Sequence, residues 1–293
     1  MQTLDQHVGL ALNFYAGQLE SHFKSHVLAY SGPIYPFALT RYREAIEALC
    51  KAPTPDGVDP KKLVIVLTTP GGIVETVEKM VEITRHHYED VSFVVPDMAM
   101  SAGTVWCMSG DRIWMDYASS LGPIDPQVQS QSANGGLVPA LGYLDKVNEF
   151  IAKANANALS AAEVIMLKGL DLAELRRFEQ ARDLSISLLK LWLVRYKFKN
   201  WLTHRTHSIG TSVTVAEREA RAEQVAVELM NNRRWNSHGR MIGMQTLRSV
   251  LLLEIDDYSD VAPIRDHAKM YSSLLTEYLE RQSMPMIVHT ARG

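Results

Sequence analysis

Strand-like and helix-like patterns of hydrophobic and polar residues alternate through the first 116 positions of the chain. The segment K-L-V-I-V-L-T is a continuous apolar run, which is typical of a strand covered on both faces. A turn and a stretch with helical spacing of apolar residues follow it, and similar units stand before and after. The predicted strands are residues 25–34, 62–68, 92–96 and 111–116, and the predicted helices are residues 37–49 and 74–86. This alternation predicts an α/β fold with a parallel sheet and right-handed crossovers.

The pattern changes after residue 140, where Gly and Pro become rare and Leu, Ala, Glu, Lys and Arg dominate. This composition indicates several helices, and Thr214 and Glu217 fit a capping box at the start of one of them. The predicted helices here are residues 172–200, 215–230 and 261–281. We interpret residues 1–140 as an α/β core and residues 141–293 as the mainly helical remainder of the same domain.

Composition narrows the class of protein. The 293 residues are 46% hydrophobic with a formal net charge of -3, as in an ordinary soluble globular protein, and no basic patch suggests nucleic acid as a partner. Cys50 and Cys107 lie in apolar stretches, so we expect buried free thiols and a reducing compartment. The sequence shows neither a signal-peptide pattern nor a membrane-spanning apolar run, and we expect a cytoplasmic protein without a membrane anchor.

The hexapeptide A-M-S-A-G-T, residues 99–104, directly follows a predicted strand. Ala99 and Gly103 flank Ser101 as A-x-S-x-G, a relaxed form of the G-x-S-x-G turn that exposes a nucleophilic serine between a strand and a helix. Small residues also occur in such turns for packing alone. Ser101 is therefore a candidate nucleophile whose assignment needs further support.

A second small-residue turn, T-T-P-G-G, ends the preceding predicted strand. Catalytic groups of parallel sheets gather at the carboxyl ends of strands, so Gly71 and Gly72 should lie near Ser101. Glycines there allow backbone N–H groups to face a developing oxyanion, with the N–H of Ala102 as the second donor. The alternative is a structural or phosphate-binding turn, but the usual phosphate-loop motifs are not present.

Three segments together resemble the serine dehydrogenase proteinase family, which is similar to signal peptide peptidase A and Clp protease. They are V-I-V-L-T-T-P-G-G-x-V, V-V-P-D-M-A-M-S-A-G-T and G-D-R-I-W-M-D-Y-A-S-S-L-G-P-I-D-P-Q, in the family's order and spacing over roughly residues 60–130. W-N-S-H-G-R-M-I, residues 235–242, resembles a further family element in which a histidine precedes an apolar strand. The resemblance implies a crotonase/Clp-like core of repeated β-β-α units with a parallel sheet, followed by a helical region.

The resemblance also implies a serine peptidase with Ser101 as nucleophile and with the Gly71-Gly72 loop and the Ala102 N–H as oxyanion hole. The chain has no histidine between His87 and His204, which excludes the spacing of the Clp triad. Relatives of signal peptide peptidase A instead use a lysine downstream of the serine.

Lys146 and Lys153 stand in the window where this lysine is expected. A lysine acts as a base only if burial lowers its pKa from about 10.4 toward neutrality. We favour Lys146, because it begins a predicted helix just after a Gly-rich loop. The competing interpretation is a solvated surface charge beside Asp145, and Lys153 is an alternative base.

Histidines are the other candidates for the general base and for metal ligands. His238, in a turn beside Gly239, is a further alternative base, since a neutral imidazole needs no large pKa shift. Asp125, in G-P-I-D-P-Q, could orient such a histidine, but we favour a role in the wall of the substrate groove. His204 and His207 have the spacing of a metal-ligand pair but no evident third ligand, so we predict no metal site.

The leading hypothesis is thus a cofactor-independent serine peptidase that acts on polypeptides through an acyl-enzyme on Ser101. The resemblance implies a homo-oligomer, with residues 141–293 supplying interface and lid elements, and Trp192 and Trp201 belong either to the interface or to the core. No ATPase motif is present, so the unfolding of substrates would need a separate unfoldase or regulatory partner.

Two other hypotheses keep the fold and change the function. One is a non-proteolytic scaffold or peptide-binding oligomer with a vestigial Ser101. The other is a crotonase-type acyl-coenzyme A enzyme, which would use the oxyanion hole without a nucleophile, so that the serine at the turn argues against it.

Overall fold

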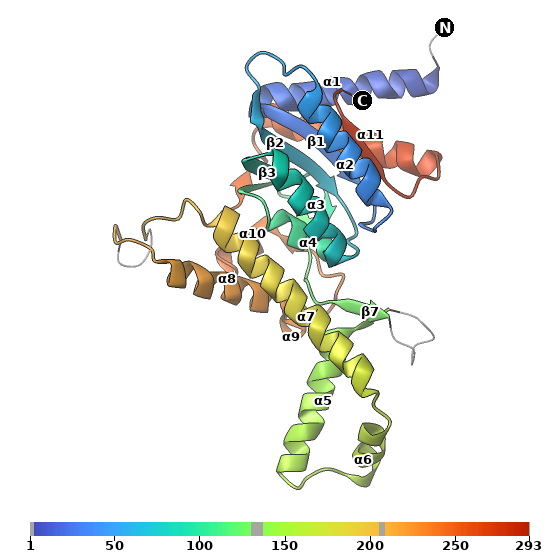
Figure 1. Cartoon of the computed structure of the whole chain (residues 1–293), viewed down its shortest axis with the longest axis vertical. Helices are drawn as coiled ribbons and strands as arrows, with labels where there is room; N and C mark the ends of the chain where they lie inside the picture. The colour runs from blue at the N-terminus through green and yellow to red at the C-terminus, as the bar shows by residue number, and fades with distance from the viewer. Residues whose placement is uncertain (1–2, 130–136, 205–208, 293) are drawn as a thin grey trace.

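The computed structural model describes residues 3–129, 137–204 and 209–292, and within them a six-stranded sheet forms the centre of the fold (Figure 1). The strand order is β10-β5-β3-β2-β1-β11. The pairs from β10 to β1 are parallel, and β11 is antiparallel to β1. The strands are β1 (Ser25–Ser31), β2 (Asp59–Thr68), β3 (Asp90–Val95), β5 (Arg112–Met115), β10 (Asp256–Asp257) and β11 (Ile287–Thr290). The predicted α/β class with a parallel sheet is confirmed.

Helices cover both faces of this sheet, and alternate strand residues point to the two sides (Figure 1). Val27 and Ala29 of β1 pack with the helices of one face, whereas Leu28 and Tyr30 pack with those of the other. The first face carries α1 (Leu4–Phe23) and α11 (Ala262–Arg281), and the second carries α2 (Ala38–Lys51), α3 (Val74–His87) and α4 (Ala102–Cys107). Double coverage explains the unbroken apolar run of residues 63–67 in the second half of β2.

A small second sheet joins distant parts of the chain beside the main one. Its strands β4 (Met98–Ala99) and β6 (Ser120–Leu121) pair in parallel, and β9 (Ile242–Gly243) pairs antiparallel with β6. The segment just before β9 is therefore held close to the turn that follows β4. A hairpin of β7 (Gln127–Gln129) and β8 (Leu137–Pro139) then leads into the helical region.

The helical region extends from the sheet in Figure 1, with α5 and α6 at its far end. Its elements are α5 (Ala140–Asn155), α6 (Ala161–Lys168), α7 (Leu172–Trp192), a π-helical turn (Leu193–Lys197), α8 (Val215–Met230), α9 (Asn232–Trp235) and α10 (Met244–Ser249). Trp192, near the end of α7, is buried in the main hydrophobic core. The helical region thus extends the core of the sheet, and only part of it projects.

Several sequence-based expectations are corrected here. Neither α1 nor β11 was expected, and α7 ends at Trp192 rather than near residue 200. Cys107 is buried as predicted, but Cys50, in the last turn of α2, is exposed. The capping box of Thr214 and Glu217 is confirmed at the start of α8. Among the described residues, no helix combines the length and apolar character needed to cross a bilayer.

Two histidines built into the sheet should make the fold sensitive to mild acid. Burial lowers the pKa of both His26 and His289 to about 4, and both rings bond to tyrosine hydroxyls, at 2.9 Å to Tyr88 and 2.6 Å to Tyr271. Between pH 6.5 and 4 the unfolded chain binds protons that the folded protein excludes, so the free energy of unfolding decreases as the pH is lowered. We expect a loss of about 1.4 kcal/mol per histidine for each pH unit within this window and no such dependence above it.

Urea denaturation at pH 7, 6 and 5 measures this dependence. His289→Asn removes one titrating group, keeps a polar partner for Tyr271 and should make the dependence shallower. Comparison with the unsubstituted protein cancels the contribution of Glu20, whose pKa is raised by burial. An equally steep loss of stability in both proteins would contradict the assignment.

Candidate active site

Ser101 lies at a sharp turn between β4 and α4. Its backbone has φ 51° and ψ -116°, a conformation that is strained for a residue with a side chain. Such turns between a strand and a helix leave the hydroxyl of the serine exposed. Ser101 is partly exposed and lines a cleft of about 810 Å³. The hexapeptide therefore forms the kind of turn that its small residues predicted.

Backbone hydrogen bonds fasten this turn to the end of β2. The N–H of Thr69 donates to the carbonyl oxygen of Met98 at 2.9 Å, and the N–H of Met100 donates to the carbonyl oxygen of Thr69 at 3.0 Å. Gly103 is required for the close approach, since a Cβ on it would lie 2.4 Å from Cγ2 of Thr69. The sequence places both turns at strand ends, and these contacts hold them together.

The Gly71-Gly72 turn lies directly against the Ser101 turn. Gly71 has φ 104°, and a Cβ on it would lie 2.9 Å from Cβ of Ser101. Gly72 has φ 153°, and a Cβ on it would lie 2.1 Å from the carbonyl oxygen of Ile34. Both positions therefore require glycine on two grounds, the left-handed backbone and the lack of space for a side chain.

The N–H groups of this turn are not equivalent. The N–H of Gly71 donates to Oγ1 of Thr69 at 3.0 Å, so it is already engaged. Within the described residues, the N–H groups of Gly72 and Ala102 have no acceptor, and that of Ala102 begins α4, where no intrahelical acceptor exists. Gly72 and Ala102 thus remain free to bind an anionic oxygen.

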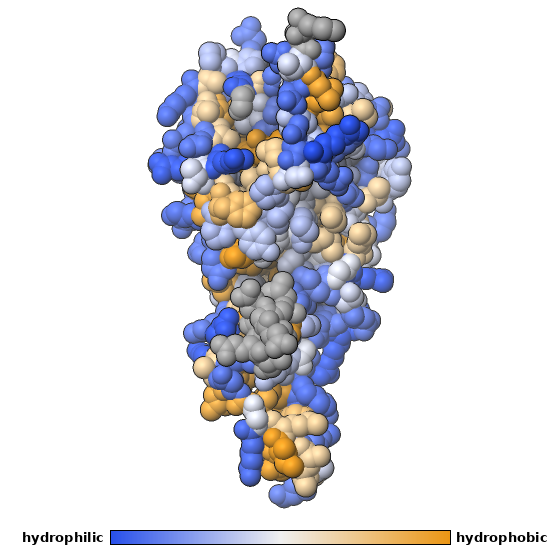
Figure 2. Space-filling view, turned by 90° about the vertical axis from the view of Figure 1, so that its right-hand side faces the viewer, coloured by the Kyte–Doolittle hydropathy of each residue, from blue (hydrophilic) through white to orange (hydrophobic). Residues whose placement is uncertain are grey.

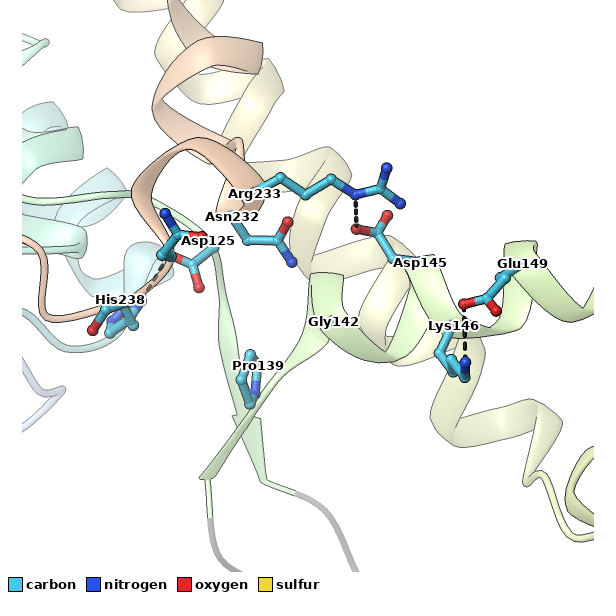
Figure 3. A pocket seen from close by; sticks show the side chains of 11 residues that line it. Asp125, Pro139, Gly142, Asp145, Lys146, Glu149, Asn232, Arg233 and His238 are labelled. Atoms are coloured by element: carbon cyan, nitrogen blue, oxygen red, sulfur yellow. Dashed lines mark hydrogen bonds and ion pairs between the residues drawn. The ribbon is translucent and has the colours of Figure 1, made fainter.

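The structure brings His238 to the same cleft as Ser101, although the two are far apart in the sequence. His238 lies in the loop between α9 and β9, and the pairing of β9 with β6 holds this loop beside the Ser101 turn. Asp125 is buried, and its Oδ1 lies 2.9 Å from Nδ1 of His238 (Figure 3). This contact orients the ring and leaves Nε2 available for another partner.

The proline-rich loop that carries Asp125 is itself anchored. The N–H of Ile124 donates to the carbonyl oxygen of Leu229 in α8 at 3.1 Å, and Nε2 of Gln127 lies 3.4 Å from Oδ2 of Asp125. The sequence indicated that this segment forms a wall of the groove, and Ile124, Pro126 and Gln127 do line the cleft of Ser101. Asp125 itself is not one of the described residues that line this cleft, and it contacts His238 instead.

The two candidate lysines lie elsewhere. Lys146 is half exposed, and its Nζ lies 2.9 Å from Oε2 of Glu149. It lines a neighbouring cavity of about 490 Å³, which it shares with Asp125 and His238, but not the cleft of Ser101. In Figure 3, Lys146 and Glu149 stand on α5, away from the pair of His238 and Asp125.

Lys153 is paired with two carboxylates. Its Nζ lies 2.7 Å from Glu163 and 3.2 Å from Glu149. Hydrogen bonds to these two carboxylates raise the pKa of Lys153, which is the opposite of what a neutral lysine base requires. Like Lys146, it does not line the cleft of Ser101.

Of the remaining histidine pair, His204 alone lies in the described part of the chain. Nε2 of His204 lies 3.2 Å from Oε1 of Glu217, and His207 lies outside the described residues. Across residues 3–129, 137–204 and 209–292, no group of three or more metal-ligating side chains was found.

Part of this chain is similar to two curated proteins. Two uncharacterized proteins of Methanocaldococcus jannaschii are 30% identical over 108 residues and 29% identical over 97 residues. The first match covers 36% of each chain, and the second covers 33% of this chain and 32% of the relative. The chain thus spans about a third of the length of the curated relatives it matches.

Two solved structures align over most of the chain. One is a mutant of the 1510-N membrane-bound stomatin-specific protease in complex with a substrate peptide, with TM-score 0.46 and 14% identity over 82% of this chain and 77% of that chain. The other is ClpP1 from Listeria monocytogenes, with TM-score 0.40 and 13% identity over 84% of this chain and 98% of that chain. The model of the ClpP-like SDH-type serine proteinases matches residues 22–192, more than half of the chain. The chain belongs to this family of ClpP-like serine proteinases.

Proposed function

We propose that this protein is a serine peptidase that hydrolyses peptide bonds through an acyl-enzyme on Ser101, with His238 as general base. One observation carries the proposal. Ser101, on its strained turn, lines the same cleft as His238, whose Nδ1 is 2.9 Å from the buried carboxylate of Asp125. A nucleophile, a base and a group that orients the base are the three parts that such catalysis needs.

The chemistry follows from these positions. Oγ of Ser101 attacks the peptide carbonyl carbon while its proton moves to Nε2 of His238, and the carboxylate of Asp125 stabilises the imidazolium that forms. The N–H groups of Gly72 and Ala102 bind the oxyanion of the tetrahedral intermediate. The imidazolium then protonates the leaving amine as the C–N bond breaks. A water molecule, deprotonated by His238, hydrolyses the ester and restores Ser101.

This assignment replaces Lys146, which the sequence favoured as the base. The change rests on geometry, because Lys146 is half exposed, is paired with Glu149 and does not line the cleft of Ser101. A neutral imidazole is available near neutral pH without a large pKa shift.

A polypeptide substrate is supported by the walls of the cleft. Gln127 and Val128 of β7 line it, and within the described residues β7 pairs with β8 on one side alone. The other edge offers backbone groups to an extended peptide, as an additional strand would use them. Cleavage of folded substrates would require a separate unfoldase.

Labelling with a fluorophosphonate tests the proposal. A probe of this type phosphonylates activated serines, and peptide mass spectrometry locates the adduct. We expect an adduct on Ser101 that is lost in Ser101→Ala and strongly reduced in His238→Ala but retained in Lys146→Ala. A correctly folded protein that gives no adduct would favour the non-proteolytic scaffold, whereas an adduct that survives His238→Ala and is lost in Lys146→Ala would restore the serine-lysine dyad.

We further propose that the protein forms a homo-oligomer through the projecting arm of α5 and α6. In α6 no side chain is buried, although Val164, Ile165 and Met166 are apolar and exposed. Figure 2 shows hydrophobic side chains at this end of the molecule. A short helix with little packing of its own is marginal in water, so contact with a second copy would stabilise it.

Substitution of this surface should shift the assembly. In Ile165→Asp with Met166→Asp, we expect smaller particles in analytical ultracentrifugation, because charged side chains cannot be buried unpaired between subunits. Glu179→Lys on α7 is the control, since it changes a partly exposed charge outside α6 and should leave the mass unchanged. An unchanged mass in the double variant would exclude this interface.

A further inference from the structure

One wall of the cleft of Ser101 is a single face of α7. Arg177, Gln180, Ala181, Leu184 and Ser185 line the cleft, at the spacing of three and four residues that aligns side chains along a helix. The next turn of α7 is buried in the main core together with residues of α4, the helix that starts at Ser101. Ser185 is buried and Arg177 is exposed, so this wall runs from the interior toward the mouth of the cleft.

Arg177 is distinguished by its lack of a partner. Among the described residues it has neither an ion pair nor a side-chain hydrogen bond, although it lines a cleft. Its neighbour Arg176 does not line the cleft and is paired with Glu179 at 2.8 Å. An unpaired guanidinium presents a planar set of N–H donors that matches a carboxylate.

The cleft also limits where such a carboxylate can lie. Glu75, in the first turn of α3, lines the cleft and has no ion-pair partner among the described residues, so it repels an acid placed beside it. Arg177 precedes Ser185 by two turns of helix, about 12 Å along its axis. An extended peptide covers this distance in roughly three or four residues.

We propose that Arg177 is a specificity-determining residue, and that it binds a carboxylate of the substrate a few residues away from the scissile bond. The inference rests on the proposed peptidase function and adds the class of substrate, a peptide with an acidic side chain or a free C-terminal carboxylate at that distance. The carboxylate contributes to binding and takes no part in bond cleavage, so its effect falls mainly on KM.

Quenched fluorescent peptides test the inference with the intact chain. A neutral parent with an amidated C-terminus is compared with peptides that carry one Asp at successive positions and with the parent bearing a free C-terminus. We expect one Asp position, or the free C-terminus, to raise kcat/KM about fivefold over the parent, the range of a solvent-accessible ion pair. The two kinds of peptide distinguish a side-chain carboxylate from a terminal one.

The variants assign the effect to one side chain. Arg177→Gln should abolish the difference, Arg177→Glu should reverse it in favour of Lys at the same position, and the matched control Arg176→Gln should retain it. Hydrolysis of the neutral parent should change little in Arg176→Gln, because Arg176 does not line the cleft. A preference for acid that survives Arg177→Gln, or no preference in the unsubstituted protein, would overturn the inference.

Binding separates this inference from the proposed chemistry. The same peptides, labelled with a fluorophore, are titrated with Ser101→Ala protein and followed by fluorescence anisotropy. Equal affinity for acidic and neutral peptides would overturn the role of Arg177 whether or not any peptide is cleaved. Preferential binding of acidic peptides without cleavage, and without fluorophosphonate labelling of Ser101, would retain the role of Arg177 and refute the peptidase function.

Discussion

Replacing His238 with alanine should lower kcat for peptide hydrolysis by a factor of about 10⁴ or more, because Ser101 then lacks a group to accept its proton. Asp125→Asn should cost about as much, since an amide facing Nδ1 favours the wrong tautomer and cannot stabilise an imidazolium. Steady-state kinetics on a quenched fluorescent peptide, with circular dichroism to verify folding, measures both effects.

Lys146→Ala is the matched control, because its side chain lines the cavity next to His238 without entering the cleft of Ser101. We expect a change of less than about twofold in kcat/KM, as for the loss of an exposed charge pair. A large loss in Lys146→Ala combined with an active His238→Ala enzyme would contradict the proposed base. The combination His238→Ala with Asp125→Asn should be no worse than either alone, since the two residues act as one unit.

Gly71→Ala should nearly abolish activity while most of the fold remains. The new Cβ would lie 2.8 Å from the carbonyl oxygen of Met100 and 2.9 Å from Cβ of Ser101, and the left-handed φ of 104° disfavours alanine. The turn that holds the nucleophile must then move. Because a displacement of about 1 Å in a reacting group costs about 10²-fold in rate, we expect at least that loss in kcat.

Gly17→Ala provides the control for this substitution. Gly17 lies within α1, and a Cβ on it would meet nothing within 4 Å. Alanine there should raise the free energy of unfolding by about 0.5–1 kcal/mol and leave kcat unchanged. Thermal unfolding and fluorophosphonate labelling of both variants separate stability from reactivity. Full labelling of Ser101 in Gly71→Ala would show that the close contact between the two turns is not needed.

The sequence alone was sufficient for the parts of the site that depend on backbone shape. Small residues at a strand end predicted the Ser101 turn, and paired glycines predicted a close approach of backbone to it. The structure bears out both, since a Cβ at Gly71 or Gly103 would collide with the facing turn. Such requirements are local, because a tight turn admits few residue types whatever surrounds it. The continuous apolar run at residues 63–67 of β2 also predicted a parallel strand, because a strand that is covered on both faces needs apolar residues at every position.

The sequence predicted the long helix α7, but not which of its side chains face the core and which face the cleft. Its apolar periodicity gave a helix from Leu172, and the structure ends it at Trp192 with a π-helical turn. Periodicity cannot tell whether an apolar stripe faces the core or another subunit, and the burial of Trp192 assigns it to the core. Likewise, no spacing rule distinguishes Arg177 in the cleft from Arg176 beside it on the outer surface.

By itself, therefore, the sequence determined the fold class, the candidate nucleophile and the glycine turn beside it. Only the tertiary structure decided which candidate base shares a cleft with that nucleophile. Lys146 fits a spacing along the chain, but α5 carries it to a cavity where Glu149 pairs with it. His238 is distant in sequence, yet the pairing of β9 with β6 brings its loop to the cleft, where Asp125 orients it. The physical reason is that the residues lining one cleft are brought together by strand pairing between remote segments, which separation along the chain does not reveal.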